Sequence, residues 1–103
     1  MAADPVLSRF RSALEAAYGD RVERAILFGS RARGDFHPDS DYDIAVFLRD
    51  PGQWFDETVR LAGLGTTILF ETGAVISAKP FHAEAYHDFS PLMRAIRSEG
   101  LDL

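Results

Sequence analysis

Two aspartates separated by a single residue, Asp41 and Asp43, form the pattern with the clearest chemical implication. They precede an apolar run over residues 44–48 that predicts a strand. Because side chains alternate along a strand, both carboxylates project from one face and Tyr42 from the other. Adjacent carboxylates repel each other unless a cation lies between them or one is protonated. Mg²⁺ prefers such oxygen ligands, so the pair predicts a metal site; the alternative is a solvated pair of turn carboxylates.

A second pattern, Gly29 followed by Ser30, comes after an apolar run over residues 25–28. Glycine allows a sharp turn at the end of a strand, and Ser30 can cap a short helix over residues 31–33. Free backbone N–H groups at such a turn, with Arg33 nearby, suit a phosphate; the alternative is an ordinary strand-to-helix turn. The aspartate pair begins 11 residues after Ser30. If the two strands are neighbours, the patterns together predict a site for a nucleoside triphosphate and Mg²⁺.

Local signals indicate the elements that must position these residues. A capping side chain followed by proline predicts helices that begin after Asp4, Asp50 and Ser90. Apolar runs predict strands over residues 21–28, 41–49 and 73–81. This order of elements predicts an α/β (α+β) fold, with a small mixed β-sheet of about three strands flanked by helices.

Glycines divide the predicted helices in two different ways. Gly19 and Gly100 end the first and third helices. Gly63 and Gly65 lie inside the second, where they either weaken the helix or let it pack closely against another element.

Length and composition exclude several classes of protein. With 103 residues the chain is predicted to be a single domain over residues 1–103. Its formal net charge of −5 argues against general nucleic-acid binding, because cationic side chains supply most of the affinity for a phosphate backbone. No apolar run reaches the roughly 20 residues of a membrane span and no secretory signal is visible, so we expect a cytoplasmic protein. The chain has no cysteine, and His37, His82 and His87 are too far apart for a zinc motif.

The segment over residues 29–34, followed by residues 40–44, resembles the minimal nucleotidyltransferase (MNT) branch of the DNA polymerase β-like superfamily. The pattern of that family is Gly-Ser, often followed by Ala-Arg-Gly, and then Ser-Asp-x-Asp-hydrophobic. The resemblance implies transfer of a nucleoside monophosphate, AMP from ATP, with release of pyrophosphate and with two Mg²⁺ ions as cofactors. By this resemblance the nucleotide-binding residues are Gly29, Ser30, Arg33 and Ser40, and the catalytic metal ligands are Asp41 and Asp43.

The chain departs from the family at the next strand, where active members usually carry a third carboxylate. The corresponding position falls near Ile76 or Ser77, and residues 73–79 contain no acid. Glu71 is the nearest carboxylate, but we expect it at the end of the second helix and not in the metal site. The resemblance therefore implies a metal site with two carboxylates, or a defective one.

In a chain of this length we expect no additional domain to bind the acceptor of the nucleotide. Minimal nucleotidyltransferases are often paired with a helical HEPN-type toxin, so the resemblance implies an antitoxin that transfers AMP to its partner. A binding module that neutralises the partner by contact alone is one alternative, and a small-molecule transferase of the aminoglycoside type is another. Residues 81–89, aromatic and poorly periodic, form either a docking surface or a loop along the edge of the sheet.

Overall fold

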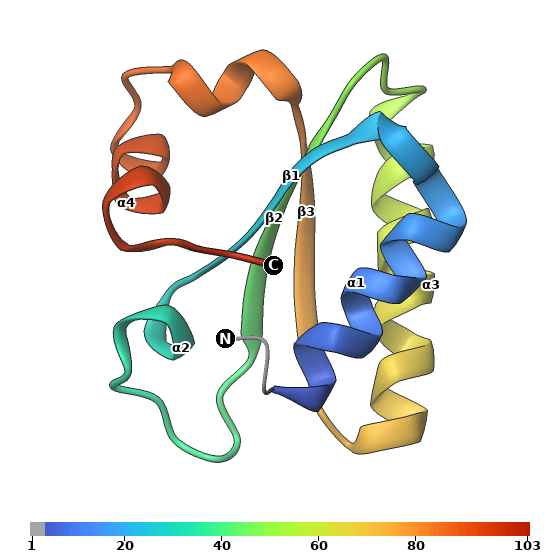
Figure 1. The fold of residues 1–103 in the computed structure, drawn as a ribbon, viewed down its shortest axis with the longest axis vertical. Helices are drawn as coiled ribbons and strands as arrows, with labels where there is room; N and C mark the ends of the chain where they lie inside the picture. The colour runs from blue at the N-terminus through green and yellow to red at the C-terminus, as the bar shows by residue number, and fades with distance from the viewer. Residues whose placement is uncertain (1–3) are drawn as a thin grey trace.

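The computed structural model describes residues 4–103, which form a four-stranded mixed sheet with helices on both faces (Figure 1). The strand order is β3-β2-β1-β4. In chain order the elements are α1 (Pro5–Tyr18), η1 (Gly19–Arg21), β1 (Val22–Phe28), α2 (Ser30–Arg33), β2 (Tyr42–Leu48), α3 (Trp54–Thr72), β3 (Ile76–His82), η2 (Ala83–His87), α4 (Pro91–Glu99) and β4 (Leu101–Asp102), where η denotes a short 3₁₀ helix.

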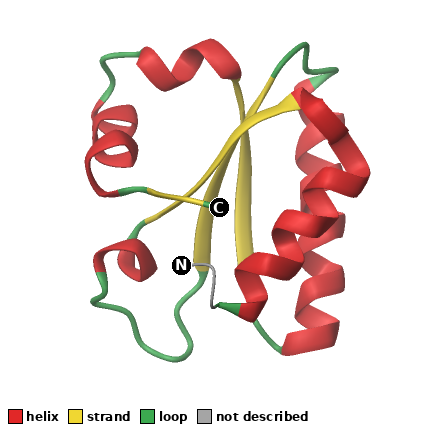
Figure 2. Cartoon of the chain, viewed as in Figure 1, coloured by secondary structure: helices red, strands yellow, loops and turns green. Residues whose placement is uncertain are grey.

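The sheet combines two kinds of strand pairing. β1 is antiparallel to both β2 and β4, whereas β2 is parallel to β3. A parallel pair needs a long crossover, and α3 provides it between β2 and β3. Figure 2 shows the strands as a layer between the helices. Of the helices in the described residues, none is long and apolar enough to cross a membrane.

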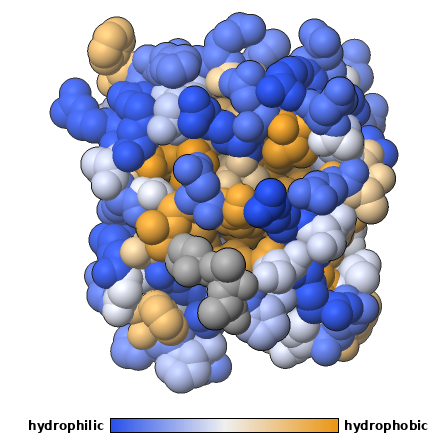
Figure 3. All heavy atoms as spheres, viewed as in Figure 1, coloured by the Kyte–Doolittle hydropathy of each residue, from blue (hydrophilic) through white to orange (hydrophobic). Residues whose placement is uncertain are grey.

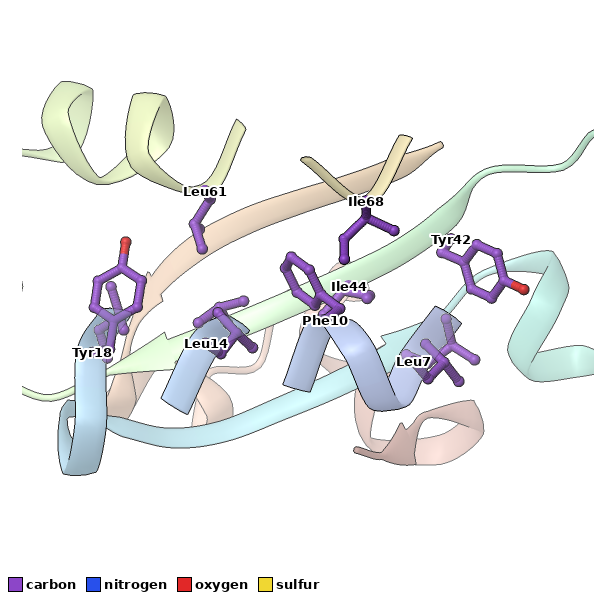
Figure 4. Close-up of a cluster of buried hydrophobic side chains, with 11 residues drawn as sticks. Leu7, Phe10, Leu14, Tyr18, Tyr42, Ile44, Leu61 and Ile68 are labelled. Carbon is purple, nitrogen blue, oxygen red and sulfur yellow. The ribbon is translucent and has the colours of Figure 1, made fainter. Parts of the chain in front are cut away.

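The central strand β2 divides the core into two layers, because its alternate side chains face opposite sides of the sheet. Tyr42, Ile44, Val46 and Leu48 pack against the buried faces of α1 and α3 (Figure 4). Ala45 and Phe47 pack on the other side, against α4 and the segment around η2. Asp43 lies two residues before Ala45 and four before Phe47, so its side chain projects to the same side of the strand as theirs. It therefore belongs to the face of the sheet opposite α1 and α3.

The predicted caps of the first and third helices are confirmed. The side chain of Asp4 accepts hydrogen bonds from the N–H groups of Val6 and Leu7, and Ser90 Oγ accepts one from Met93 N–H. These caps use only neighbouring residues, which is why the sequence signal was sufficient.

The predicted start of the second helix after Asp50 is wrong, because α3 begins at Trp54 with Gln53 at its N-cap. Asp50 has a φ of +46° and cannot start a helix. The Gly52 N–H donates to Glu57 Oε2 (2.9 Å), so this backbone group is satisfied by a side chain of α3 outside the helix. Gly63 and Gly65 do not interrupt α3, and a Cβ at Gly65 would lie 3.3 Å from the Ile76 carbonyl oxygen. Of the two alternatives for these glycines, a weakened helix or close packing, the structure shows close packing of α3 against β3 at Gly65.

The expectation of about three strands missed β4, which pairs with Ile26 and Leu27 of β1. A strand of two residues is too short to show an alternating pattern. Figure 3 shows hydrophobic side chains in the middle of the face that carries the C-terminus, with hydrophilic residues around them. Because β4 pairs with Ile26 and Leu27 alone among the residues of β1, it covers the edge of β1 only in part.

Residues 81–89 mainly cover the sheet. The Phe81 and Tyr86 rings both lie 5.5 Å from the Phe47 ring, the first stacked and the second edge-on. Phe89 is 89% exposed and makes no such contact. The segment consists of the end of β3 and of η2, which covers Phe47, and it ends in one exposed aromatic ring.

A buried carboxylate joins α1, η1 and α3. Glu57 is 4% exposed and accepts hydrogen bonds from Tyr18 Oη (3.1 Å), Arg21 Nη2 (2.7 Å) and Gly52 N–H (2.9 Å). Burial alone would raise the pKa of Glu57, but the bonds from Gly52, Arg21 and Tyr18 outweigh it and lower that pKa. Burial and the Glu57 charge raise the pKa of Tyr18 to about 12. The ionised form of Glu57 thus stabilises the fold.

We expect Glu57→Gln to lower the free energy of unfolding at pH 7 by about 2 kcal/mol, because the donors lose their charged acceptor. Since the native pKa lies below the ordinary value of 4.5, the contribution is complete above that pH and is lost as pH falls through the native pKa. In urea unfolding between pH 7 and pH 3, the unfolding free energies of the wild type and Glu57→Gln should therefore converge as the pH falls. The exposed Glu15, paired with Arg11, offers the control Glu15→Gln, for which we expect a loss below about 0.5 kcal/mol. A difference in unfolding free energy between the wild type and Glu57→Gln that stays constant with pH would contradict this role.

Candidate active site

The two predicted patterns meet at one end of the β1–β2 pair. Phe28, the last residue of β1, pairs with Asp43 of β2, so Gly29 follows directly beside the carboxylate. A Cβ at Gly29 would lie 2.5 Å from Asp43 Oδ2. Gly29 has a φ of 76° and a ψ of −157°, a conformation that is essentially restricted to glycine. The glycine turn and the aspartate are therefore adjacent, as the sequence analysis required.

The turn begins the short helix α2 without help from a side chain. The Gly29 carbonyl oxygen accepts from the N–H groups of Ala32 and Arg33, each at 3.1 Å. The prediction that Ser30 caps a helix starting at residue 31 is wrong: Gly29 is the N-cap, and Ser30 is the first helical residue and makes no capping hydrogen bond. The glycine backbone already provides the turn geometry, so the Ser30 hydroxyl is not needed as a cap.

The two aspartates differ in exposure. Asp41 is exposed just before β2, whereas Asp43 is half-buried within the strand. Burial and the Asp41 charge raise the pKa of Asp43, while the charges of Lys79 and Arg33 oppose this effect. The carboxylates thus repel each other, which is the condition that a bound cation relieves.

The residue beside Asp43 on the parallel strand β3 is Ser77. In-register residues of neighbouring strands project from the same face, so Ser77 occupies the place where a third acid was expected. Glu71 instead lies in α3 and forms an ion pair with Arg9 of α1 at 2.5 Å, on the opposite face of the sheet. Within residues 4–103, no three His, Cys, Asp or Glu side chains converge as a metal site. The candidate metal ligands are therefore the two carboxylates Asp41 and Asp43.

The loop between α2 and β2 is held by a residue that the sequence analysis did not single out. Arg31 donates from Nε to the Ser40 carbonyl oxygen (2.9 Å) and from Nη2 to the Pro38 carbonyl oxygen (3.0 Å). Its guanidinium also lies over the Tyr42 ring, 4.0 Å from the centroid. Ser40 Oγ accepts from the His37 N–H at 2.9 Å, so the Ser40 side chain shapes the loop that leads to Asp41.

Arg33 is anchored from two sides. Its Nε lies 3.3 Å from Asp35 Oδ2, and its Nη1 lies 3.2 Å from Glu99 Oε1. Hydrogen bonding to Asp35 and its charge, with a smaller effect from Glu99, raise the pKa of Arg33. Glu99 belongs to α4 and also accepts from the Gly29 N–H at 3.3 Å. No sequence signal indicated Glu99, because 70 residues separate it from Gly29.

Comparison with known families gives a match over most of the chain. The family model described as "Nucleotidyltransferase domain" matches residues 7–85. The chain is 37% identical over 75 residues to "Putative protein adenylyltransferase MJ0604" of Methanocaldococcus jannaschii, and the match covers 73% of this chain and 69% of that protein.

Solved structures share the architecture. A crystal structure of "a putative nucleotidyltransferase from Sulfolobus solfataricus" aligns with a TM-score of 0.65 at 16% identity, over 94% of this chain and 75% of the other. A crystal structure of a "toxin-antitoxin with AMP-PNP" aligns with a TM-score of 0.64 at 18% identity, over 90% of this chain and 68% of the other. At these identities the likeness shows a common fold.

The contact between Gly29 and Asp43 predicts different effects for two glycine substitutions. Both Gly29 and Gly34 have positive φ, but a Cβ at Gly34 would meet nothing within 4 Å. We expect Gly34→Ala to cost about 1–2 kcal/mol of unfolding free energy from backbone strain alone. Gly29→Ala should cost at least about 1 kcal/mol more, because its backbone conformation is less accessible to alanine than the αL conformation of Gly34 and because the methyl group also displaces the Asp43 carboxylate.

Chemical denaturation of both variants measures this difference. In an Asp43→Ala background the extra cost of Gly29→Ala should shrink, because the clashing oxygen is gone. Equal losses for the two glycine variants would show that Asp43 does not constrain the turn.

Proposed function

The chain belongs to the nucleotidyltransferase domain family, and on that basis we propose that it transfers AMP from ATP to a hydroxyl group of a protein partner, with Mg²⁺ as cofactor. The observation that carries the proposal is the proximity of the Gly29 turn to Asp43: Phe28 pairs with Asp43, and a Cβ at Gly29 would lie 2.5 Å from Asp43 Oδ2. This juxtaposition puts candidate donors for phosphate beside candidate ligands for a cation. A nucleoside triphosphate with its divalent ion needs both.

The donor set of the site fits Mg²⁺. Asp41 and Asp43 offer hard carboxylate oxygens, and their repulsion raises the pKa of Asp43 in addition to the effect of burial. Mg²⁺ commonly binds through one or two carboxylates together with substrate phosphates, so a third acid is not required for binding. When bound, the ion would neutralise phosphate charge and hold the triphosphate in place.

The remaining groups at the turn suit the phosphates. We assign the Gly29 N–H, the Ser30 hydroxyl and the Arg33 guanidinium to the triphosphate, since all three are hydrogen-bond donors at one end of β1. Lys79 adds positive charge on the same face of the sheet as Asp43. Ser40 contributes by holding the loop that presents Asp41.

The proposed reaction is an in-line displacement at the α-phosphorus of ATP. The oxygen of the acceptor hydroxyl forms a bond to phosphorus while the bond to the bridging oxygen of pyrophosphate breaks. Pyrophosphate leaves with that electron pair, and the hydroxyl proton passes to solvent or to a nearby base. Positioning and charge neutralisation supply most of the rate enhancement in such reactions.

Two relatives support a protein acceptor and a toxin as partner. MJ0604 is named as a protein adenylyltransferase, and one structural neighbour is a toxin–antitoxin complex with AMP-PNP. We propose that the acceptor is a helical toxin of the HEPN type and that transfer of AMP silences it, so that this chain acts as the antitoxin.

A second candidate function is neutralisation by contact without transfer. Ser77 beside Asp43 favours this alternative, because a hydroxyl is a weaker metal ligand than a carboxylate. The two functions differ in whether Asp41 and Asp43 are needed to act on the partner: transfer of AMP requires them, and neutralisation by contact does not.

Label transfer distinguishes them. We expect α-³²P-ATP with Mg²⁺ to label a protein band in a lysate of the native host, and γ-³²P-ATP to leave that band unlabelled because pyrophosphate is released. The double variant Asp41→Asn, Asp43→Asn should reduce the label at least about 100-fold, since positioning and charge neutralisation are both lost. Asp39→Asn, an exposed loop aspartate in the same segment, is the matched control and should label like the wild type.

A partner that co-purifies equally with the wild type and the double variant, without any labelled band, would refute transfer and support neutralisation by contact.

A further inference from the structure

A carboxylate of this chain already binds the donors that the proposed function assigns to phosphate. Glu99 Oε1 accepts from the Gly29 N–H at 3.3 Å and lies 3.2 Å from Arg33 Nη1. One oxygen atom thus contacts both a backbone donor of the turn and a cation beside it. A phosphate oxygen has the same hydrogen-bonding requirements as this carboxylate oxygen.

The backbone of Glu99 is held in place by β1, the strand that ends at the turn. Glu99 is the last residue of α4, and a Cβ at the following Gly100 would clash with Ile26 Cγ2. Leu101 then pairs with Leu27 in the β1–β4 ladder. The end of α4 is therefore fixed beside β1. Leu27, to which Leu101 pairs, lies only two residues before Gly29.

The side chain of Glu99 is less constrained than its backbone. It is 26% exposed, so it reaches solvent and has room to change rotamer without movement of α4. Asp35 holds the other side of the Arg33 guanidinium at 3.3 Å, with a side chain that is 63% exposed. Both acids can release Arg33, but only Glu99 also occupies the Gly29 N–H.

We propose that Glu99 is an internal competitor for the nucleotide phosphates, which occupies the Gly29 N–H and Arg33 in the free protein and is displaced when a triphosphate binds. The Gly29 N–H has one hydrogen to donate, so the two anions exclude each other there. A carboxylate left beside a triphosphate would also repel it. This inference rests on the proposed function, because it takes the turn to be the phosphate site.

Direct binding of AMP-PNP with Mg²⁺ to the purified chain in the absence of an acceptor protein, measured by calorimetry, tests the proposal without transfer. Glu99→Gln removes the charge and keeps the shape, and we expect it to tighten binding about fivefold, the scale of one partly exposed charge-assisted contact. Glu99→Asp keeps the charge but shortens the reach, and it should also tighten binding. The control is Glu84→Gln in η2, which makes the same change in net charge at a side chain that is 90% exposed. Its affinity should stay within twofold of the wild type.

A second readout follows the contact itself. In ¹H–¹⁵N spectra of the free proteins, the Gly29 amide signal should shift in Glu99→Gln and stay in place in Glu84→Gln. Addition of AMP-PNP to the wild type should shift the Gly29 amide signal, whereas amide hydrogen exchange at residues 99–102 should stay unchanged, because the Glu99 side chain moves while the β1–β4 pairing remains.

The outcomes separate the two proposals. If Glu99→Gln binds AMP-PNP as the wild type does, or more weakly, Glu99 orients the turn and is not a competitor, while the nucleotide site stands. If none of the proteins binds AMP-PNP, the result refutes the proposed nucleotide site and, with it, the competition by Glu99.

Discussion

The antiparallel register of β1 and β2, which pairs Phe28 with Asp43, is the constraint on which the site depends. A shift of one residue would turn Asp43 toward the apolar layer of α1 and α3 and move Gly29 away from it. Such a slip would also exchange the side chains of the two core layers and disrupt their packing, since residues 44–48 of β2 are each buried completely. Burial of the central strand on both faces therefore maintains the geometry of the aspartate. The core and the site are specified by the same ladder of hydrogen bonds.

Burial of β2 on both faces also explains why the C-terminal segment comes close to the site. The layer of α1 and α3 covers one face, and the opposite face needs Met93 and Ile96 of α4 to bury Ile26 and Phe47. Once α4 lies there, β4 pairs with β1, and Glu99 ends beside the Gly29 turn. In a chain of 103 residues, the elements that complete the core are also those that border the site.

Carboxylates outnumber cations around the turn. The charges of Lys79 and Arg33 act on Asp43, and Arg33 is in turn paired with Asp35 and Glu99. Arg31 takes no part in these ion pairs, because its guanidinium is held by carbonyl oxygens of the loop and by the Tyr42 ring. The two arginines of α2 therefore have separate roles: one fixes the loop, and the other is the cation available to an anion.

The sequence by itself determined the features that depend on neighbouring residues: the caps at Asp4 and Ser90, the glycine turn after β1, and the family, whose pattern lies within residues 29–44. These follow from backbone conformation and side-chain alternation over a few residues. Only the tertiary structure decided that α3 starts at Trp54, that Ser77 lies beside Asp43, and that Glu99 reaches the Gly29 N–H. Each of these results from a contact between side chains or strands that are distant in the chain, and such contacts are selected by the packing of the whole core and leave no local pattern.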